Sequence, residues 1–565
     1  MMAREQHSVL DPGTPDGEAR PPYPVTAAPP PGRTWRRWLP PLLVVVLLAQ
    51  MAAAMVTTAV QQTPTIDEPI YVATAADYLH EHRVRFNPEH PPLGKLVVAA
   101  GVAVADPRLD TSSKGDQSRF AQHLLYGSGN DPWRLMFWAR LPVIVLTLLF
   151  GLVVFAFARE LAGAAAGLAA LALYAFSPDL IAHGSLATLD VPAAGFVLTS
   201  AWLLWRSRRR PRLYVPLAGL ALGAGLATKM SVLPVVPVLV GLAAWAVWRP
   251  GAADRRRALV RSLGAAALVA VAAVAVVWAS YLAVDPRLRW SAAGQQVPAV
   301  HGVKGLLVQL MPVPESYRDG MRIQFGLEKY PWQGFLFGHL YTGSRWYYLP
   351  AALLVKTPLG MLALWTAGAV AVVAVRRLRP AAPYVLLPAA VLLAAAMTGS
   401  RDFGTRYAIF VPMFLAVAAG CVLVNRWRWA PLATGALVLF VAVSSLRTFP
   451  YYLPYSNEAF GGPSKTYLRL HDSNVDWGQD LGRLADRLRE RYRGERVWLV
   501  YKGSGVPSYY GIDAADPREV PARQVHGLLV VSDTAVDKAR GRLAALIKSS
   551  RPVDEVGRSI TIYRR

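Results

Sequence analysis

The sequence contains little cysteine and few charged residues. Its single cysteine, Cys421, lies in an apolar run of a 565-residue chain, which excludes a disulfide framework and a metal cluster held by thiolates. Only 17% of the residues are charged and 54% are hydrophobic, which is too apolar for a soluble globular enzyme or a disordered chain. The composition therefore indicates a membrane protein.

Acidic residues are also scarce relative to basic ones. The chain has 60 Lys and Arg against 36 Asp and Glu, a formal charge of +24. A nucleic-acid-binding protein would gather such cations on one folded face beside stacking aromatic residues. Here the cations are scattered between apolar stretches, so we expect no nucleic-acid partner.

Apolar stretches near the ~20 residues needed to cross a bilayer recur along the chain. We predict a polytopic α-helical membrane protein with about eleven spans. The predicted spans are residues 39–60, 139–158, 164–182, 191–205, 213–227, 232–248, 259–283, 347–375, 384–397, 407–424 and 430–446.

The regions between and beyond these spans suggest a domain organisation. Residues 1–37 are rich in Pro, Gly and Arg and are predicted to form a disordered tail before a membrane core at 38–447. Two long loops, 61–138 and 284–345, interrupt the core. Residues 448–565 alternate a helical pattern at 481–488, β runs at 497–501, 528–531 and 560–563, and a helix at 535–547, which predicts a small α/β domain.

The short basic connections predict the orientation, because Lys and Arg are retained on the cytoplasmic side. With a cytoplasmic N-terminus, four strongly basic connections fall on that side, and the long loops and the C-terminal domain lie outside the cytoplasm. These connections are residues 206–212, 249–261, 376–379 and 426–428.

Two adjacent carboxylates, Asp67 and Glu68, follow the first predicted span. Charged groups near the membrane are costly to desolvate and are rarely placed there without a role. Two interpretations remain open: the pair carries chemistry, or it caps a helix that starts at Pro69. His90, in a His-Pro-Pro segment, is a further candidate, although a lone His more often only makes hydrogen bonds.

The predicted C-terminal domain begins with a string that contains one His and several Asp residues. His471, Asp472, Asp476 and Asp480 are poorly spaced for a metal site, so we favour the start of a capped helix with solvated carboxylates and predict no metal ligands. A divalent cation is not required by the sequence, and any cofactor stays unknown.

Several short motifs occur together and in order after residue 39. They are Asp67-Glu68, His90-Pro91-Pro92-Leu93-Gly94-Lys95, Ala139-Arg140-Leu141-Pro142, Thr188-Leu189-Asp190-Val191-Pro192, Gly225-Leu226-Ala227-Thr228-Lys229, Arg406-Tyr407 and the string from His471 to Leu481. In this combination the chain resembles the protein O-mannosyltransferases and the related aminoarabinose transferases. The resemblance implies the C-type glycosyltransferase fold and a polyprenyl-phosphate sugar as the donor.

The resemblance implies that Asp67 is the catalytic base and that Glu68 positions it or the donor. A displacement at C1 of a lipid-phosphate sugar also needs a cation for the departing phosphate. Arg406, next to Tyr407, suits this role because guanidinium binds phosphate bidentately. Lys229 is a second candidate, with a snorkelling lysine as its alternative, and for Asp190 we favour a helix cap over chemistry.

Together these features predict a glycosyltransferase of the cell membrane. It would move a hexosyl or pentosyl group, mannosyl among the candidates, from a polyprenyl-phosphate carrier to a glycan, lipid or protein acceptor on the outer face, with inversion. Possible substrate contacts are His90, Asp190 and Tyr407. The main alternative is a transporter or flippase of a lipid-linked sugar, which would bury ionisable residues in mid-span. Only Lys356 clearly fits that pattern.

Overall fold

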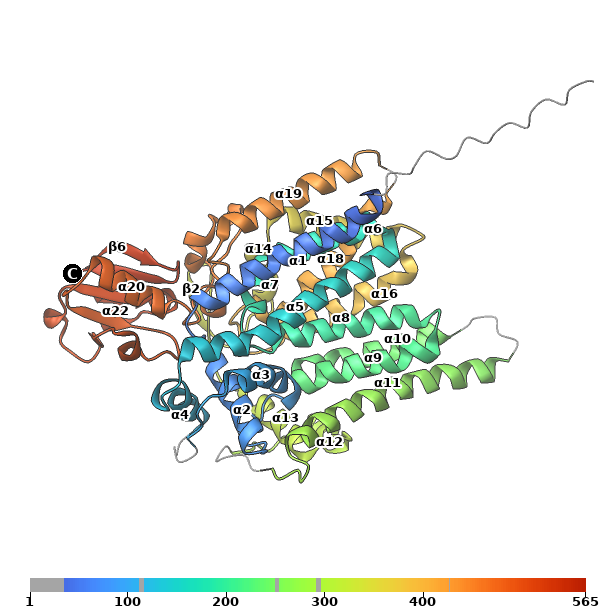
Figure 1. Cartoon of the computed structure of the whole chain (residues 1–565), viewed down its shortest axis with the longest axis horizontal. Helices are drawn as coiled ribbons and strands as arrows, with labels where there is room; N and C mark the ends of the chain where they lie inside the picture. The colour runs from blue at the N-terminus through green and yellow to red at the C-terminus, as the bar shows by residue number, and fades with distance from the viewer. Residues whose placement is uncertain (1–34, 111–115, 249–253, 291–295, 426) are drawn as a thin grey trace, which may run out of the picture.

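A computed structural model describes residues 35–110, 116–248, 254–290, 296–425 and 427–565 (Figure 1). Apart from its last three residues, the predicted disordered tail at 1–37 lies outside the described part of the chain. The larger part of the remainder is a bundle of long helices, and a small domain with a β-sheet follows it (Figure 1).

Helices occupy every stretch that was predicted to span the membrane. They are α1 (Trp35–Gln61), α5 (Pro132–Ala162), α6 (Ala164–Ala175), α7 (Pro178–Gly184), α8 (Asp190–Ser207), α9 (Pro211–Thr228), α10 (Val236–Val247), α11 (Arg255–Val284), α14 (Tyr348–Lys356), α15 (Leu359–Ala374), α16 (Ala382–Val385), α17 (Leu387–Ala396), α18 (Phe410–Gly420) and α19 (Ala430–Thr448). The chain is therefore a polytopic helical membrane protein.

The number of full-length spans differs from the predicted eleven. Six described helical segments are long and apolar enough to cross a membrane, or seven if the pair α6 and α7, bent by 62°, forms one span. Proline lies at two of the interruptions, where it lacks the N–H group that a continuing helix needs and disfavours helical geometry in the residue before it. Pro178 opens α7 after a break, and Pro358 separates α14 from α15.

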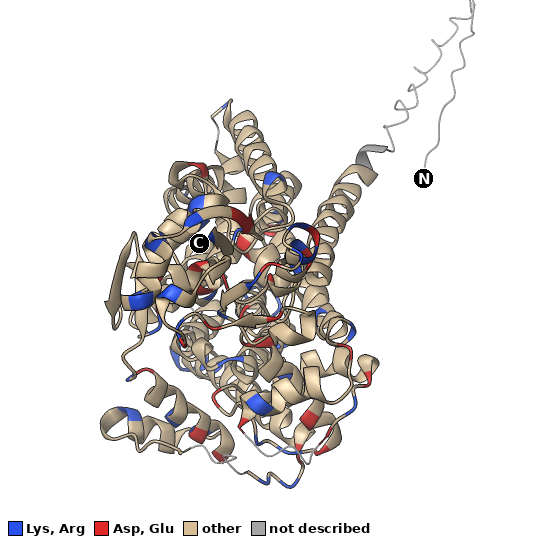
Figure 2. Ribbon diagram, turned by 90° about the vertical axis from the view of Figure 1, so that its left-hand side faces the viewer, with Lys and Arg blue, Asp and Glu red and all other residues tan. Residues whose placement is uncertain are grey.

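The helices run along the long axis of the molecule, and the C-terminal domain lies at one end (Figure 1). The start of α1, the end of α10 and the starts of α11 and α19 lie at the opposite end (Figure 1). Viewed from the end that carries the C-terminal domain, basic and acidic residues are interspersed (Figure 2). The helix ends that flank two of the predicted basic connections therefore lie at the opposite end of the bundle from the C-terminal domain.

The two long loops contain short elements. The first has α2 (Glu68–His80), α3 (Pro92–Ala105) and α4 (Gln117–Gln122), and the second has α12 (Gly302–Leu310), α13 (Glu315–Leu327) and a hairpin of β1 (Gln333–Leu336) and β2 (His339–Thr342). Gly94 lets α3 approach the start of α8, because a Cβ atom there would lie 2.6 Å from Cδ2 of Leu189.

The C-terminal domain is a five-stranded mixed sheet with the strand order β4-β3-β5-β7-β6. Strands β4 (Ala514–Ala515), β3 (Val497–Val500) and β5 (Leu528–Ser532) are parallel, whereas β7 (Ile560–Arg564) pairs antiparallel with β5 and with β6 (Arg551–Val556). Its helices are α20 (Leu481–Arg491), α21 (Asp533–Asp537) and α22 (Gly541–Lys548). The strand patterns predicted β3, β5 and β7, but missed β4 and β6. The single helix expected at 535–547 is broken before Gly541, whose φ is +52°.

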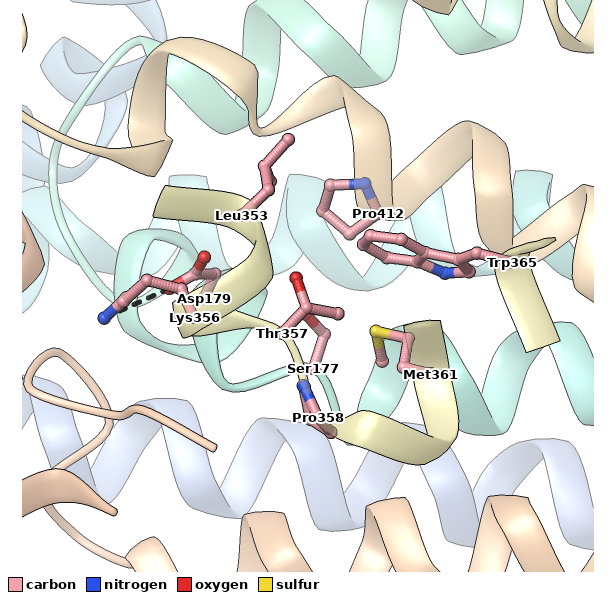
Figure 3. A pocket seen from close by; sticks show the side chains of 9 residues that line it. All are labelled: Ser177, Asp179, Leu353, Lys356, Thr357, Pro358, Met361, Trp365 and Pro412. Carbon is pink, nitrogen blue, oxygen red and sulfur yellow. Dashed lines mark ion pairs between the residues drawn. The ribbon is translucent and has the colours of Figure 1, made fainter. Parts of the chain in front are cut away.

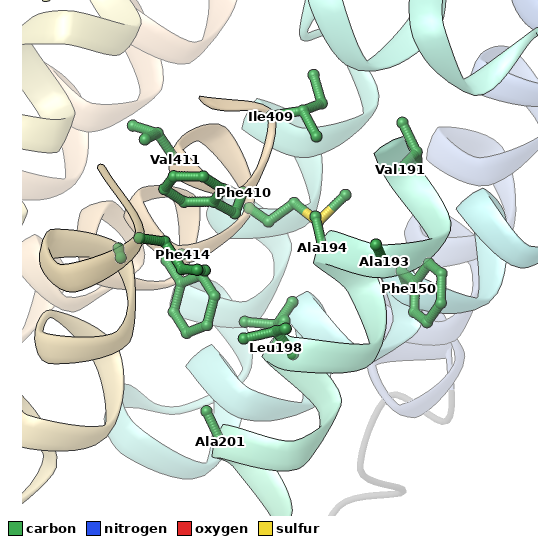
Figure 4. Packing of buried hydrophobic residues seen from close by; sticks show 14 of the residues in the cluster. Phe150, Val191, Ala193, Ala194, Leu198, Ala201, Ile409, Phe410, Val411 and Phe414 are labelled. Atoms are coloured by element: carbon green, nitrogen blue, oxygen red, sulfur yellow. The ribbon is translucent and has the colours of Figure 1, made fainter. Parts of the chain in front are cut away.

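Packing between α8 and α18 brings two of the candidate residues together. Leu198 and Ala194 on α8 lie near Phe410 and Phe414 on α18 in one buried hydrophobic cluster (Figure 4). Asp190 begins α8, and Arg406 lies in the short 3₁₀ turn Thr405–Ala408 just before α18. The apolar contact therefore supports a polar site at the starts of these two helices.

Candidate functional site

Asp67 lies where the chain leaves α1 and enters α2. Its side chain makes no capping hydrogen bond, so the structure does not support the capping interpretation. Instead, its Oδ2 accepts a hydrogen bond of 2.6 Å from Nη1 of Arg406, and its side chain remains 27% exposed. Asp67 is therefore a reachable carboxylate held against a guanidinium.

Glu68 is chemically similar to its neighbour but has a different environment. Its carboxylate is fully buried and accepts hydrogen bonds from Nε and Nη2 of Arg140, each 2.7 Å long. The backbone N–H groups of Thr65 and Ala187 also donate to it, at 2.9 and 2.8 Å. Burial alone would raise the pKa of Glu68, but Arg140 and these donors lower it below its ordinary value. Glu68 is thus an ionised anchor.

Arg140 also satisfies the end of the first helix. Its Nη1 donates to the carbonyl oxygens of Ala59 and Gln62, at 2.6 and 2.8 Å, and its Nη2 donates to that of Thr63 at 3.2 Å. The last carbonyls of a helix lack partners within the helix, and a cation there also complements the helix dipole. One arginine on α5 therefore ties the end of α1 to the start of α2, on either side of Asp67.

Arg406 is buried among aromatic rings. Its guanidinium lies 4.9 Å from the ring centroid of Tyr407 and 4.3 Å from that of Trp477, and its Nη2 donates to the Tyr407 hydroxyl at 3.3 Å. Among the described residues its buried Nε has no hydrogen-bond partner. A buried N–H group without a partner is costly, so this group is a ready donor to a ligand oxygen.

Asp190 and Lys229 form a second ion pair in the site. Nζ of Lys229 lies 2.5 Å from Oδ1 of Asp190, and the two side chains are 11% and 3% exposed. The capping expectation for Asp190 was wrong, because Leu189 holds the N-cap position and Asp190 makes no capping bond. The snorkelling interpretation of Lys229 was also wrong, because its ammonium turns to Asp190 and lies 5.4 Å from the ring centroid of Tyr407. Because α8 and α9 pack antiparallel, the start of α8 and the end of α9 lie together, which brings Asp190 and Lys229 into contact. This pair lies in the same region as Arg406.

His90 is buried beside the same cluster. Its ring meets the edge of Tyr71 at a centroid distance of 5.9 Å, and Nδ1 has no hydrogen-bond partner in the described part of the chain. Burial, together with the positive charges of Lys229 and Lys95, holds the pKa of His90 well below its ordinary value. The buried imidazole of His90 is therefore placed to donate or accept a hydrogen bond in the site.

The carboxylates of the C-terminal string are buried, so the expectation of solvated side chains was wrong. Asp472 is paired with Lys502, which lowers its pKa to about 2 although burial alone would raise it. Asp480 accepts a 2.7 Å hydrogen bond from Ser559, and burial raises the pKa of Asp476 to about 7. Within the described ranges, no group of three or more His, Cys, Asp or Glu side chains is arranged to hold a metal ion.

Lys356, the mid-span cation expected of a transporter, has structural partners. It forms an ion pair with Asp179 at 3.4 Å on the wall of a small pocket between α7, α14, α15 and α18 (Figure 3). Its Nζ also donates to the carbonyl oxygens of Leu453 and Asn474, which lie beyond the last helix of the bundle. These bonds tie the C-terminal region to the bundle. The residues that line this pocket do not include Asp67, Arg406, Asp190 or Lys229.

Sequence patterns missed three residues of the site. Arg140 was visible as a charge within an apolar span, a placement that requires a buried partner, yet Glu68 was not identified as that partner. Arg401, which is 18% exposed and donates to Glu328 at 2.8 Å, adds positive charge near Tyr407. Trp477 had no local signal, because its contact with Arg406 joins distant segments.

Comparisons with known proteins agree with the membrane-enzyme prediction. Residues 44–290 match the profile of the family described as dolichyl-phosphate-mannose-protein mannosyltransferase. The matched segment contains Asp67, Asp190 and Lys229, whereas Arg406 lies beyond it. No curated protein sequence matches the chain.

Among solved structures, the chain is similar to ArnT from Cupriavidus metallidurans in the apo state. The two share 14% sequence identity, the match covers 92% of this chain and 97% of that chain, and the TM-score is 0.48. The same protein bound to undecaprenyl phosphate has 15% identity, the same coverage and a TM-score of 0.43. The archaeal oligosaccharyltransferase AglB from Archaeoglobus fulgidus, in complex with an inhibitory peptide and a dolichol-phosphate, has 12% identity, coverage of 92% and 73%, and a TM-score of 0.44.

The family match bears directly on the resemblance predicted from the motifs. That resemblance is confirmed over residues 44–290, the segment that matches the model of this mannosyltransferase family.

Proposed function

We propose that this protein transfers a hexosyl-type sugar from a polyprenyl monophosphate to an acceptor hydroxyl, with inversion at C1. The reaction takes place at the end of the bundle that carries the C-terminal domain, on the outer face of the cell membrane. The proposal includes the C-type glycosyltransferase fold with eleven membrane passages, some of them broken, and a cytoplasmic N-terminus. The sugar, with mannosyl among the candidates, and the acceptor are open.

The observation that carries this proposal is the pair of Asp67 and Arg406. Asp67 is a partly exposed carboxylate, and Arg406 is a buried guanidinium whose Nε has no partner among the described residues. A phosphate oxygen would satisfy that N–H group, and a charge-assisted hydrogen bond contributes about 1.5–3 kcal/mol. Lys229 and Arg401 lie in the same region but are paired with Asp190 and Glu328, so the proposal depends on the unpartnered Nε–H of Arg406.

The reaction balances with these groups. The acceptor oxygen attacks C1 of the sugar from the face opposite the phosphate, and the acceptor proton moves to the Asp67 carboxylate. The bond between C1 and the phosphate oxygen breaks, and its electron pair leaves with the polyprenyl phosphate. The gain in negative charge on that oxygen is stabilised by Arg406, which makes Arg406 more effective in the transition state than in the ground state.

The resting ion pair implies an order of binding. Nη1 of Arg406 lies 2.6 Å from Oδ2 of Asp67, so in the free protein the guanidinium neutralises the base. A donor phosphate competes for the same guanidinium and draws part of its charge away from Asp67. Donor binding therefore loosens the contact between Arg406 and the Asp67 carboxylate before the acceptor hydroxyl is engaged.

Substitution of Asp67 tests the function. Asp67→Asn keeps the size of the side chain but cannot accept the acceptor proton, so transfer should fall by about 10²–10⁴. Asp67→Asn should bind undecaprenyl phosphate at least as tightly as the parent, because the neutral amide competes less for the Arg406 guanidinium, and the variant should remain folded. The assay measures sugar transfer from a set of radiolabelled polyprenyl-phosphate sugars to membrane extracts by the purified, reconstituted protein.

Asp116→Asn is the matched control, because Asp116 caps α4 through hydrogen bonds to Ser118 and Arg119 and Asn caps equally well. Asp116→Asn should keep full transfer activity. Full activity of Asp67→Asn would refute the general base, and movement of the labelled lipid across the bilayer without transfer would favour the transporter alternative.

A further inference from the structure

The C-terminal domain contacts the candidate site through residues 471–480, which we call the 471–480 loop. Its backbone binds the segment just before Asp67: the Ile66 N–H donates to the carbonyl oxygen of Trp477 at 3.0 Å, and the Thr63 N–H donates to that of Gln479 at 3.0 Å. The Thr63 hydroxyl donates to the carbonyl oxygen of Gly478, also at 3.0 Å. The loop therefore holds the chain that leads into the proposed base.

The same loop also binds the segment just before Arg406. The backbone N–H of Thr405 donates to Oδ1 of Asn474 at 3.1 Å, and the hydroxyl of Ser473 donates to the carbonyl oxygen of Phe403 at 2.8 Å. The carbonyl oxygen of Asn474 in turn accepts a hydrogen bond from Lys356 at 3.0 Å. One loop of the C-terminal domain thus bridges the two segments that carry the proposed catalytic pair.

Trp477 lies at the centre of this bridge. It is 1% exposed, and its ring centroid is 4.3 Å from Cζ of Arg406, within the range of a cation–π contact. The ring supports one side of the guanidinium while Asp67 and Tyr407 contact its Nη atoms. This contact restricts the tilt of the guanidinium, and with it the direction of the unpartnered Nε–H.

We propose that the 471–480 loop forms part of the donor site and that Trp477 is a positioning residue, which holds the Arg406 guanidinium in the orientation that binds the donor phosphate. This inference rests on the proposed function. It assigns the C-terminal domain a direct part in the site, because without the loop the segments before Asp67 and Arg406 lose their common support. A tryptophan that only filled space would act on stability and not through Arg406.

A double-mutant cycle between Trp477 and Arg406 tests this role, because residues that act through one another are not additive. The probe is undecaprenyl phosphate, and its binding to the purified full-length protein in detergent is measured by microscale thermophoresis. Trp477→Leu should weaken binding by about 2- to 30-fold, the range of a buried cation–π contact. Trp477→Phe, which keeps an aromatic face, should lie between Trp477→Leu and the parent.

Arg406→Ala should weaken binding by about 10- to 100-fold, and adding Trp477→Leu to it should cause no further loss. Trp498→Leu is the matched control. Trp498 is 2% exposed in β3 and has Arg496 4.7 Å from its ring, so it repeats the tryptophan–arginine contact inside the C-terminal domain. This variant should lower thermal stability and leave the affinity for undecaprenyl phosphate unchanged.

Two outcomes would overturn the inference and are distinguishable from failure of the proposed function. If Arg406→Ala weakens binding but Trp477→Leu and Trp477→Phe do not, Trp477 has no positioning role. If the losses of Trp477→Leu and Arg406→Ala add fully in the double variant, Trp477 does not act through Arg406. Parent-like binding by Arg406→Ala would instead refute the phosphate site itself. Should Trp477→Leu not fold, the cycle is run with Trp477→Phe, for which the same three outcomes decide.

Discussion

Replacement of Arg140 by Met tests the anchor that fixes the position of Asp67. Arg140 and Glu68 are both fully buried, and the Glu68 carboxylate accepts five hydrogen bonds, two from Arg140, two from Thr65 and one from Ala187. Removing the guanidinium leaves a buried carboxylate without its counter-charge. Breaking a buried ion pair in this way costs about 3–5 kcal/mol.

The double variant Glu68→Leu/Arg140→Met separates two contributions of the arginine. Replacing both partners of a buried pair by apolar residues is often close to neutral, so the charge penalty should disappear. The carbonyl oxygens of Ala59, Gln62 and Thr63 would still lose their donor, at about 1 kcal/mol for each net hydrogen bond. The double variant should therefore recover part of the lost stability but stay below the parent.

Thermal inactivation of the purified protein in detergent measures these effects. We expect the rate of inactivation to rise most in Arg140→Met, and less in Glu68→Gln, where the guanidinium keeps its three carbonyl partners. Arg159→Met is the control, since Arg159 lies near the other end of the same helix and outside the site. A rate for Arg140→Met equal to that of the parent would refute the anchoring role.

Two further predictions concern the C-terminal domain. Burial raises the pKa of Asp537 from 3.8 to about 9. Above pH 3.8 the unfolded state therefore releases a proton that the folded state keeps. The free energy of unfolding contributed by this group falls as the pH rises from about 4 to 9. Asp537→Asn should therefore unfold at a higher temperature than the parent by a margin that grows between pH 5 and 9; a constant margin would contradict this. The second prediction concerns topology. A reporter that is active only outside the cytoplasm should work when fused after Arg565 and fail when fused before Met1. Protection of the C-terminal domain from protease in intact spheroplasts would contradict the proposed orientation.

Local patterns predicted much of the bundle, because apolar runs and basic connections are properties of neighbouring residues. They also marked Asp67, Arg406 and Lys229 as candidates at the ends of apolar segments, and the catalytic and binding roles of these residues stay predictions. They could not show that Asp190 pairs with Lys229, because this contact depends on antiparallel packing of α8 and α9. Without that partner, a carboxylate at the start of a helix resembles an ordinary cap.

The role of the C-terminal string was hidden for a related reason. Asp472 looks solvated in the sequence, but Lys502, thirty positions later, neutralises it inside the fold. Thr63 and Gly478 are 415 residues apart and share a hydrogen bond. No periodicity links segments at such a distance, so the contact between Trp477 and Arg406 could be found only in the folded chain.

The difference between Asp67 and Glu68 shows where residue type stops being informative. The two acids are adjacent and chemically alike, and neighbouring positions at the start of a helix point about 100° apart. That turn directs Glu68 toward Arg140 and three further donor groups of Thr65 and Ala187, where it is fully buried, and directs Asp67 toward Arg406 and the exposed side of the site. Arg140 on α5 thus buries Glu68 completely, whereas Asp67, although paired with Arg406, remains 27% exposed and is the acid of the two that a substrate can reach.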